Sequence, residues 1–242
     1  MTSRTARRSV RRTVPGRLLL ALSLLVTGII VGVGAPSPTP SAASPTTPEL
    51  LLVGDSMMHS LAQPYGASAR SLLGARHSFL LDTAGCRRLI TTSCRIGSGP
   101  TPANAWTVVQ ARAGQYHRAL VVAVGYNDPT YGPGSLDVAV DVLRAEARSQ
   151  GIEHIIWLTY REAGPSASRF RAHNNLLRAK ASTDPNLIIA DWALVSSFMP
   201  TSWFSSDGIH LGADAARGLA DLIADTADLL DLLPPETACS VA

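Results

Sequence analysis

The chain contains few cysteines, no acidic residue in its first 48 positions and no internal repeat. Its three cysteines are Cys86, Cys94 and Cys239, and no second Cys or His pair stands near them at the spacing of a zinc site, which argues against a bound metal. The missing repeat excludes a solenoid or a propeller. What remains is a length of 242 residues with 46% hydrophobic side chains, which predicts one globular domain with an appendage.

The appendage is the N-terminal leader, residues 1–35. A basic run precedes 18 uncharged residues at positions 18–35, and its arginines are Arg4, Arg7, Arg8, Arg11, Arg12 and Arg17. This pattern is typical of a secretory signal peptide or an N-terminal membrane anchor, and the length of the apolar run lies between the two. Cleavage after Ala35 would place Pro36 next, and cleavage after Ala43 is the alternative. No cysteine lies nearby, which excludes a lipoprotein anchor, and in either case the remainder is expected to be exported.

Residues 36–48 are rich in Pro, Ser and Thr and are expected to form an extended linker. The globular domain is expected over residues 49–231, with residues 232–242 as a C-terminal tail. Without residues 1–35 the chain has 15 basic and 18 acidic residues, so its net charge is −3 and no longer +3. The high isoelectric point is therefore a property of the leader, and the domain gives no indication of nucleic-acid binding.

The cysteines indicate a disulfide. In an exported domain a Cys86–Cys94 bridge is the expected pairing, because it closes a short loop. Cys239 lies in the C-terminal tail, where it is either free or an alternative partner for one of the other two. A structural bridge is favoured over a reactive thiol or a metal ligand.

Apolar segments and helical patterns alternate along the domain. Strands are predicted at residues 50–53, 79–81, 119–124, 155–160 and 187–190, and helices at residues 57–71 with a break at Pro64, 103–115, 136–149, 167–181 and 213–230. A long loop is expected over residues 85–102. Strands that are apolar throughout and alternate with helices predict a five-stranded parallel sheet with helices on both faces. The fold class is therefore α/β, a three-layer α/β/α sandwich.

The first strand leads into a serine in a distinctive place. The strand ends at Gly54, and Asp55 and Ser56 follow where a helix would begin. Ligands of open α/β sheets bind at the carboxyl edge of the strands, and unpaired helix N–H groups there favour negative charge. Ser56 is therefore a candidate nucleophile. The alternative is an ordinary N-cap serine.

Further polar and glycine residues follow other elements at the same edge. Gly85 follows the second strand, and the third strand ends at Gly125, Tyr126, Asn127 and Asp128. The loop before the last helix contains Asp207-Gly208-Ile209-His210. Taken alone, Asn127 is best interpreted as a turn residue, and His210 as a loop histidine near the start of a helix. Together with Ser56, these motifs favour a catalytic site.

These four motifs, in this order, resemble the SGNH (GDSL-type) serine hydrolase family, and the match covers residues 49–231. The resemblance implies a flavodoxin-like SGNH hydrolase fold. One departure is small: Met57 stands where the first motif of the family has leucine, an apolar substitution of similar volume. The Gly-x-Ser-x-Gly signature of α/β-hydrolases is absent around Ser56.

The chemistry explains the residue types. A serine hydroxyl needs a neighbouring base to become nucleophilic, and His210 is the candidate base. Asp207, three residues earlier, can accept the other imidazole N–H and fix the tautomer. The other five histidines lack this arrangement. By resemblance, the oxyanion hole consists of the backbone N–H groups of Ser56 and Gly85 and the side-chain amide of Asn127.

Three aromatic residues lie in or near the motifs. Tyr126, Trp203 and Phe204 either line a substrate pocket or pack against the core. No cofactor and no metal are expected.

The expected function is an exported serine esterase that removes short acyl groups, of the acetyl type, from a carbohydrate or cell-envelope glycan. Export, the linker, the 5% aromatic content and the lack of an obvious apolar lid motivate this substrate class. Two alternatives remain. One is an acyltransferase that uses the same triad, and the other is a non-catalytic envelope-binding module on a degenerate hydrolase fold. The natural ester, the acyl chain length and the oligomeric state do not follow from the sequence.

Overall fold

A computed structural model of the chain describes residues 47–233. The leader, nearly all of the linker, Cys239 and most of the C-terminal tail lie outside these residues, so the expectations for them stay predictions. Among residues 47–233, no helix is both long enough and apolar enough to cross a membrane.

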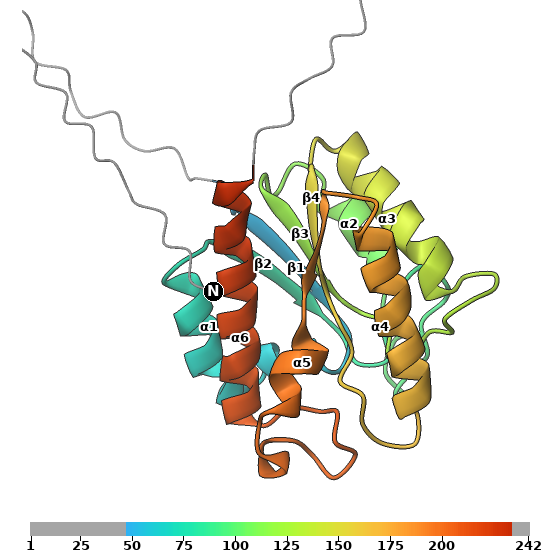
Figure 1. Cartoon of the computed structure of the whole chain (residues 1–242), viewed down its shortest axis with the longest axis vertical. Coiled ribbons are helices and arrows are strands. Elements are labelled where there is room, and N and C mark those ends of the chain that lie inside the picture. Colours follow the sequence, from blue (N-terminus) through green and yellow to red (C-terminus); the bar gives the residue numbers. More distant parts are fainter. Residues whose placement is uncertain (1–46, 234–242) are drawn as a thin grey trace, which may run out of the picture. The chain divides into compact units, whose positions relative to one another are not determined.

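The domain is built on a five-stranded parallel sheet, as predicted (Figure 1). The strand order is β2-β1-β3-β4-β5, which is the flavodoxin-like order. The bounds are β1 Leu50–Gly54, β2 Phe79–Thr83, β3 Ala119–Ala123, β4 His154–Leu158 and β5 Leu187–Ala190. Every residue of β1 and β3 is buried, because helices cover both faces of the sheet.

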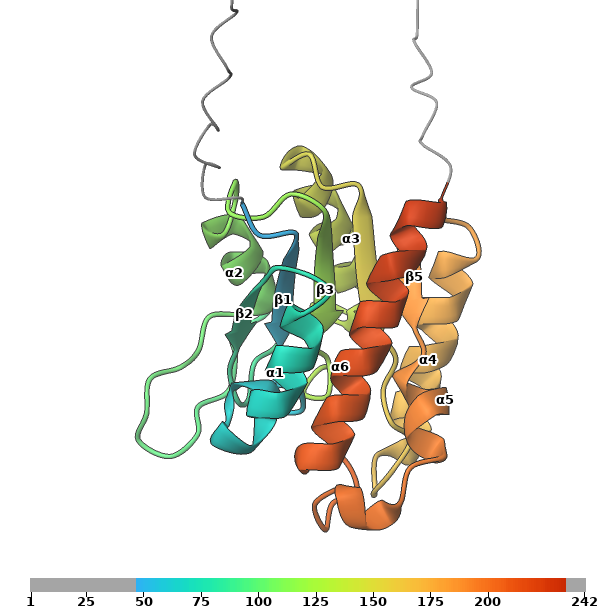
Figure 2. The same ribbon diagram turned by 90° about the vertical axis from the view of Figure 1, so that its left-hand side faces the viewer.

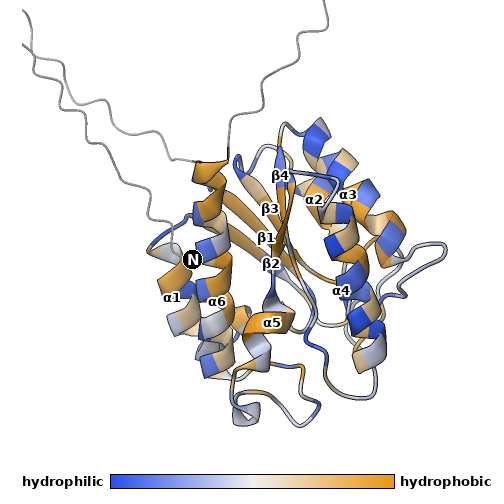
Figure 3. Cartoon of the chain, viewed as in Figure 1, coloured by the Kyte–Doolittle hydropathy of each residue, from blue (hydrophilic) through white to orange (hydrophobic). Residues whose placement is uncertain are grey.

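Helices form the two outer layers (Figures 1 and 2). On one face α1 packs against α6, and on the other α2 packs against α3 while α4 contacts β5. The bounds are α1 Ala67–Gly74, α2 Ala105–Ala111, α3 Leu136–Ser149, α4 Ala167–Ala181, α5 Trp192–Ser197 and α6 Ala213–Asp228. Figure 3 shows apolar strands between helices that turn polar residues outward, so the core lies on both sides of the sheet.

The predicted break at Pro64 in the helix over residues 57–71 is confirmed, but the residues before α1 are not α-helical. Two 3₁₀ turns, Met58–Ala62 and Pro64–Gly66, precede α1. Pro64 lacks the N–H that a continuous helix needs. Arg70 then donates to the carbonyl of Gln63 at 3.0 Å and also to that of Leu61, which satisfies acceptors that the interrupted helix leaves free.

One helix was not predicted. The segment after β5 was interpreted as a loop, but it contains α5, whose N-cap is Asp191. The carboxylate of Asp191 accepts from the N–H of Leu194 at 3.2 Å and thereby starts this short helix. A 3₁₀ turn at Thr201–Trp203 follows, and a last one at Leu229–Leu232 ends the described chain.

Candidate active site

Three strands end at the same level of the sheet. Gly54 at the end of β1 pairs with Thr83 of β2 and with Ala123 of β3. The predicted site residues Ser56, Gly85 and Asn127 follow these three ends within four residues. The register therefore brings segments that are far apart in the sequence to one edge, where open α/β sheets bind their ligands.

Asp55, whose side chain is fully buried, holds the turn after β1. One carboxylate oxygen accepts from the N–H of Met57 at 3.0 Å, and the other accepts from the N–H groups of Gly125 and Tyr126 at 3.1 and 3.2 Å. Burial, the largest influence on this carboxyl, raises the pKa of Asp55 to about 6, and the three N–H groups offset that rise only in part. Asp55 thus ties the end of β1 to the end of β3 and supports the geometry of both turns.

The turn after β3 depends on glycine at position 125. Gly125 has φ +142°, and a Cβ there would lie 2.1 Å from the hydroxyl oxygen of Tyr160. That hydroxyl donates to the carbonyl of Val124 at 2.7 Å. A side chain at Gly125 would therefore displace Tyr160 and the turn that leads to Asn127.

The loop before α6 is folded tightly on itself. The N–H of Ser205 donates to the carbonyl of His210 at 2.8 Å, and the N–H of Gly208 donates to the carbonyl of Ser205 at 2.8 Å. Gly208 has φ +72°, which favours glycine. One oxygen of Asp207 accepts from the N–H groups of Ile209 and His210 at 2.8 and 3.1 Å. These bonds fix Asp207 and His210 relative to each other.

The structure brings Ser56, His210 and Asp207 together in a chain of hydrogen bonds. The distance from Nε2 of His210 to Oγ of Ser56 is 2.9 Å, and the distance from its Nδ1 to Oδ2 of Asp207 is 2.5 Å. With the proton on Nδ1, Nε2 is free to accept the serine hydroxyl proton. Ser56 and His210 are 154 residues apart in the sequence, so only the tertiary fold places them side by side.

The two aspartates of the site differ in their pKa. Partial burial pushes the pKa of Asp207 upward, but the hydrogen bonds from Ile209 and His210 outweigh it, and the net shift is downward. The side chains of Asp207 and His210 remain 43% and 45% exposed. Asp207 therefore keeps its negative charge beside the imidazole at neutral pH, which stabilises an imidazolium.

Three candidate donors lie around the turn after β1. Within residues 47–233, the backbone N–H groups of Ser56 and Gly85 donate to no protein acceptor. The amide nitrogen of Asn127 donates to the carbonyl of Arg87 at 3.0 Å, which orients the amide and uses one of its two hydrogens. Next to Gly85, the predicted Cys86–Cys94 disulfide is present, with a Cα–Cα distance of 5.3 Å.

The three aromatic residues are placed mainly by packing. Tyr126 is buried, and its ring meets those of Tyr160 and Phe170 edge to face at centroid distances of 5.1 and 4.8 Å. Phe204 is also buried, and Trp203 packs against the core while partly exposed. Their contact with a substrate stays a prediction.

Arg161 was not singled out in the sequence. It follows β4 at the same edge and contacts the loop that contains His210. Its position after an apolar strand was the available signal. Among residues 47–233, no group of three or more His, Cys, Asp or Glu side chains is arranged to hold a metal ion.

No protein-family model and no curated protein sequence matches the chain. Several solved structures do resemble it in fold. The C-terminal catalytic domain of peptidoglycan O-acetyltransferase A from Streptococcus pneumoniae is 18% identical at a TM-score of 0.57, and the match covers 77% of this chain and 96% of that one. A protein from Slackia heliotrinireducens classed as an SGNH hydrolase is 17% identical at a TM-score of 0.56, with coverages of 75% and 99%. Est24, a carbohydrate acetylesterase from Sinorhizobium meliloti, is 14% identical at a TM-score of 0.52, with coverages of 75% and 99%. The chain therefore has the fold of the SGNH hydrolases, as the order of its motifs predicts.

Proposed function

We propose that the domain is an SGNH-type serine esterase that hydrolyses short-chain acyl esters, of the acetyl type, on a carbohydrate or cell-envelope glycan. The observation that carries this proposal is the continuous hydrogen-bond chain from Ser56 through His210 to Asp207. The carbohydrate acetylesterase and the peptidoglycan acetyltransferase among the structural relatives support the substrate class.

In the first half of the reaction, Oγ of Ser56 attacks the ester carbonyl carbon while Nε2 of His210 takes the hydroxyl proton. Asp207 holds the imidazole and stabilises its positive charge. The tetrahedral oxyanion accepts hydrogen bonds from the N–H groups of Ser56 and Gly85 and from the amide of Asn127. His210 then returns the proton to the leaving alcohol as the C–O bond breaks, which leaves the acyl group on Ser56.

In the second half, His210 takes a proton from water as the water oxygen attacks the acyl carbon. The second tetrahedral intermediate collapses, the carboxylic acid leaves, and Ser56 regains its proton from His210. If a hydroxyl of a second molecule replaces the water, the same residues transfer the acyl group. The structural likeness to an O-acetyltransferase domain favours this transfer as the second candidate function.

We further propose that the domain works outside the cytoplasm, secreted or tethered through residues 18–35. The basic and apolar composition of residues 1–35 supports export. The Cys86–Cys94 bridge also supports an oxidising compartment.

A fluorophosphonate probe, which reacts with activated serines, tests the proposal. We expect it to label the wild type and Ser149→Ala, a control at an exposed serine that ends α3, but not Ser56→Ala. Absence of labelling in all three would instead support a non-catalytic envelope-binding module.

A series of nitrophenyl esters, assayed beside acetylated glycans, tests the substrate class. We expect the highest kcat/KM for acetyl or other short chains. A preference for long chains would contradict the proposal and indicate a lipase or thioesterase. Added glycan acceptors that gain an acetyl group would indicate transfer.

A further inference from the structure

Arg161, the residue that follows Tyr160 after β4, makes three contacts with the segments that surround the catalytic loop. Its Nε donates to the carbonyl of Gly208 at 2.8 Å, between Asp207 and His210. One terminal nitrogen donates to the carbonyl of Ser196 in α5. The guanidinium carbon lies 3.7 Å from the centre of the Phe204 ring, a cation–π contact. A single side chain thus connects α5, Phe204 at the start of the loop, and Gly208 within it.

Arg161 is also connected to the turn that holds the nucleophile. Its backbone N–H donates to the hydroxyl oxygen of Tyr126 at 2.8 Å. The backbone N–H of Tyr126 in turn donates to the buried carboxylate of Asp55 at 3.2 Å. A continuous path of hydrogen bonds therefore runs from Asp55, beside Ser56, through Tyr126 and Arg161 to Gly208.

The backbone after β4 also fits closely against the catalytic loop. A Cβ on Gly164 would lie 3.0 Å from the carbonyl oxygen of Asp207, and a Cβ on Gly208 would lie 3.1 Å from the Cβ of Ala163. The loop therefore rests on the segment that Arg161 begins. Since a guanidinium is planar and always charged, it can hold two carbonyls while it stacks on a ring, which lysine cannot reproduce fully.

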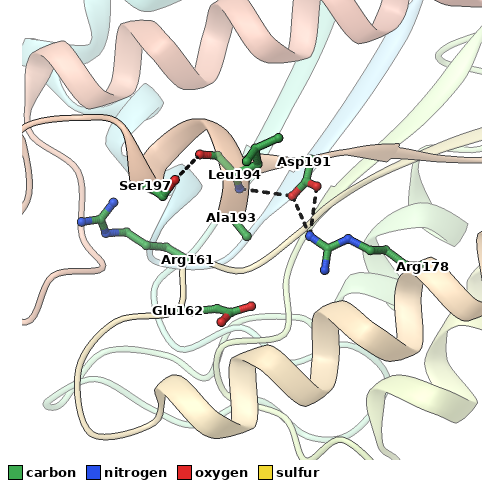
Figure 4. A pocket seen from close by; sticks show the side chains of 7 residues that line it. All are labelled: Arg161, Glu162, Arg178, Asp191, Ala193, Leu194 and Ser197. Atoms are coloured by element: carbon green, nitrogen blue, oxygen red, sulfur yellow. Dashed lines mark hydrogen bonds and ion pairs between the residues drawn. The ribbon is translucent and has the colours of Figure 1, made fainter.

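A second arginine in the same region provides a contrast. Arg161 and Arg178 both line an open cavity of about 450 Å³ between the end of β4, α4 and α5. In Figure 4, Arg178 is directed at Asp191 and Arg161 is directed away from it. Arg178 binds the carboxylate of Asp191 at 3.0 Å to each oxygen, and no contact between Arg178 and the catalytic loop is found within residues 47–233.

We propose that Arg161 is a positioning residue for the reaction: through Gly208 it holds the Asp207–His210 loop in the orientation that points the imidazole at Ser56. The inference rests on the proposed function and adds that the reaction needs Arg161 to hold the loop in place. A small displacement of a general base is costly, because a shift of about 1 Å can reduce the rate on the order of a hundredfold.

The experiment compares Arg161→Ala, Arg161→Lys and the control Arg178→Ala in nitrophenyl acetate hydrolysis. We expect kcat of Arg161→Ala to fall about tenfold to a hundredfold while KM changes less than about threefold. Arg161→Lys should lose less, because an ammonium can still donate to Gly208. Arg178→Ala should stay within about twofold of the wild type, because its ion pair is partly exposed.

Amide hydrogen exchange gives a readout that is independent of activity. The N–H groups of Ile209 and His210 donate to Asp207, and these bonds slow their exchange with solvent. The amide exchange rate of a peptide that covers residues 205–211 should therefore rise in Arg161→Ala and stay at the wild-type value in Arg178→Ala. If Arg161→Ala does not fold, Arg161→Lys tests the inference instead, and its kcat should fall and its exchange rate in residues 205–211 should rise, both by less than expected for Arg161→Ala.

Two results would overturn the inference: an active wild type with an unchanged kcat and unchanged exchange in the Arg161 variants, or an equal loss of kcat in Arg178→Ala. An inactive wild type would overturn the proposed function instead. The exchange comparison would then still show whether Arg161 orders the loop.

Discussion

Ser56, the proposed nucleophile, and His210, its proposed base, are supported in opposite ways. The turn around Ser56 is built into the core, because Asp55 is fully buried and binds three backbone N–H groups from two strand ends. The loop with Asp207 and His210 lies at the surface, with both side chains nearly half exposed. The first region is held by the fold, and the second by local hydrogen bonds and Arg161. Stability should therefore depend mainly on the first region, and activity can be lost in the second without unfolding.

The sharpest test of this difference is His210→Ala. We expect kcat/KM for nitrophenyl acetate to fall on the order of 10⁵-fold or more, because Ser56 loses its base. Since the side chain is exposed, the free energy of unfolding should change by less than about 1 kcal/mol. Urea denaturation beside the kinetic assay measures both. A large loss of stability would contradict the contrast between the two regions.

Asp207→Ala should have the next largest effect, a fall in kcat on the order of 10³- to 10⁴-fold. Some activity should remain, because Asp207 orients the imidazole and stabilises its charge but does not react. The same kinetic assay measures it, with Asp214→Ala in the first turn of α6 as a control acidic residue. Equal activity in the two variants would remove Asp207 from the site.

Asp55→Asn tests the buried region through pH. The folded-state pKa of Asp55, about 6, lies above the ordinary 3.8, so between these values the folded state binds more protons than the unfolded state. The free energy of unfolding of the wild type, relative to Asp55→Asn, should fall as pH rises from 4 to 6, by on the order of 2 kcal/mol. Urea denaturation at several pH values measures this difference. A difference that does not vary with pH would contradict a raised pKa.

The same reasoning gives the opposite sign for Asp207. Its folded-state pKa is lowered, so its contribution to stability is present above its ordinary pKa and is lost as pH falls through the lower, folded value. The pH profile of a variant at each aspartate therefore distinguishes the buried region from the exposed one.

Among the three variants that test turnover, Asn127→Ala should have the smallest effect. We expect a fall in kcat of about a hundredfold, equivalent to about 2.7 kcal/mol, if its amide donates to the oxyanion. Stability should change little, because the bond to the carbonyl of Arg87 is only partly buried. Nitrophenyl acetate kinetics measure the loss. Unchanged turnover would leave the N–H groups of Ser56 and Gly85 as the proposed donors.

The sequence predicts the sheet well, because uninterrupted apolar runs such as residues 119–124 permit few alternatives to a buried strand. It also predicts that Ser56, Asp207 and His210 belong to one site, because Ser56 follows the first strand, the other two lie in the loop before the last helix, and the order of these motifs resembles that of the SGNH hydrolases. The start of the first helix was predicted too early, because Arg70 stabilises the preceding 3₁₀ turns through its bonds to the carbonyls of Leu61 and Gln63. The helix α5 was missed, because six residues are too few to show a helical period.

The sequence does not predict residues that act by holding a distant segment in place. Nothing near Arg161 in the sequence indicates that its side chain reaches Gly208, which lies 47 residues later. The role of Asp55 in joining two strand ends likewise depends on the register between β1 and β3. Such contacts need a tertiary structure, since they join segments that have no common local pattern.

The packing of α1 against α6 has a consequence for the time at which the proposed site becomes complete. α1 follows Ser56 and α6 follows His210, and the two helices lie side by side on one face of the sheet. A nascent chain that has emerged only as far as α5 contains the serine but not the histidine. We therefore expect the proposed site to become complete only when the last long helix docks, which requires that synthesis of the domain is almost finished.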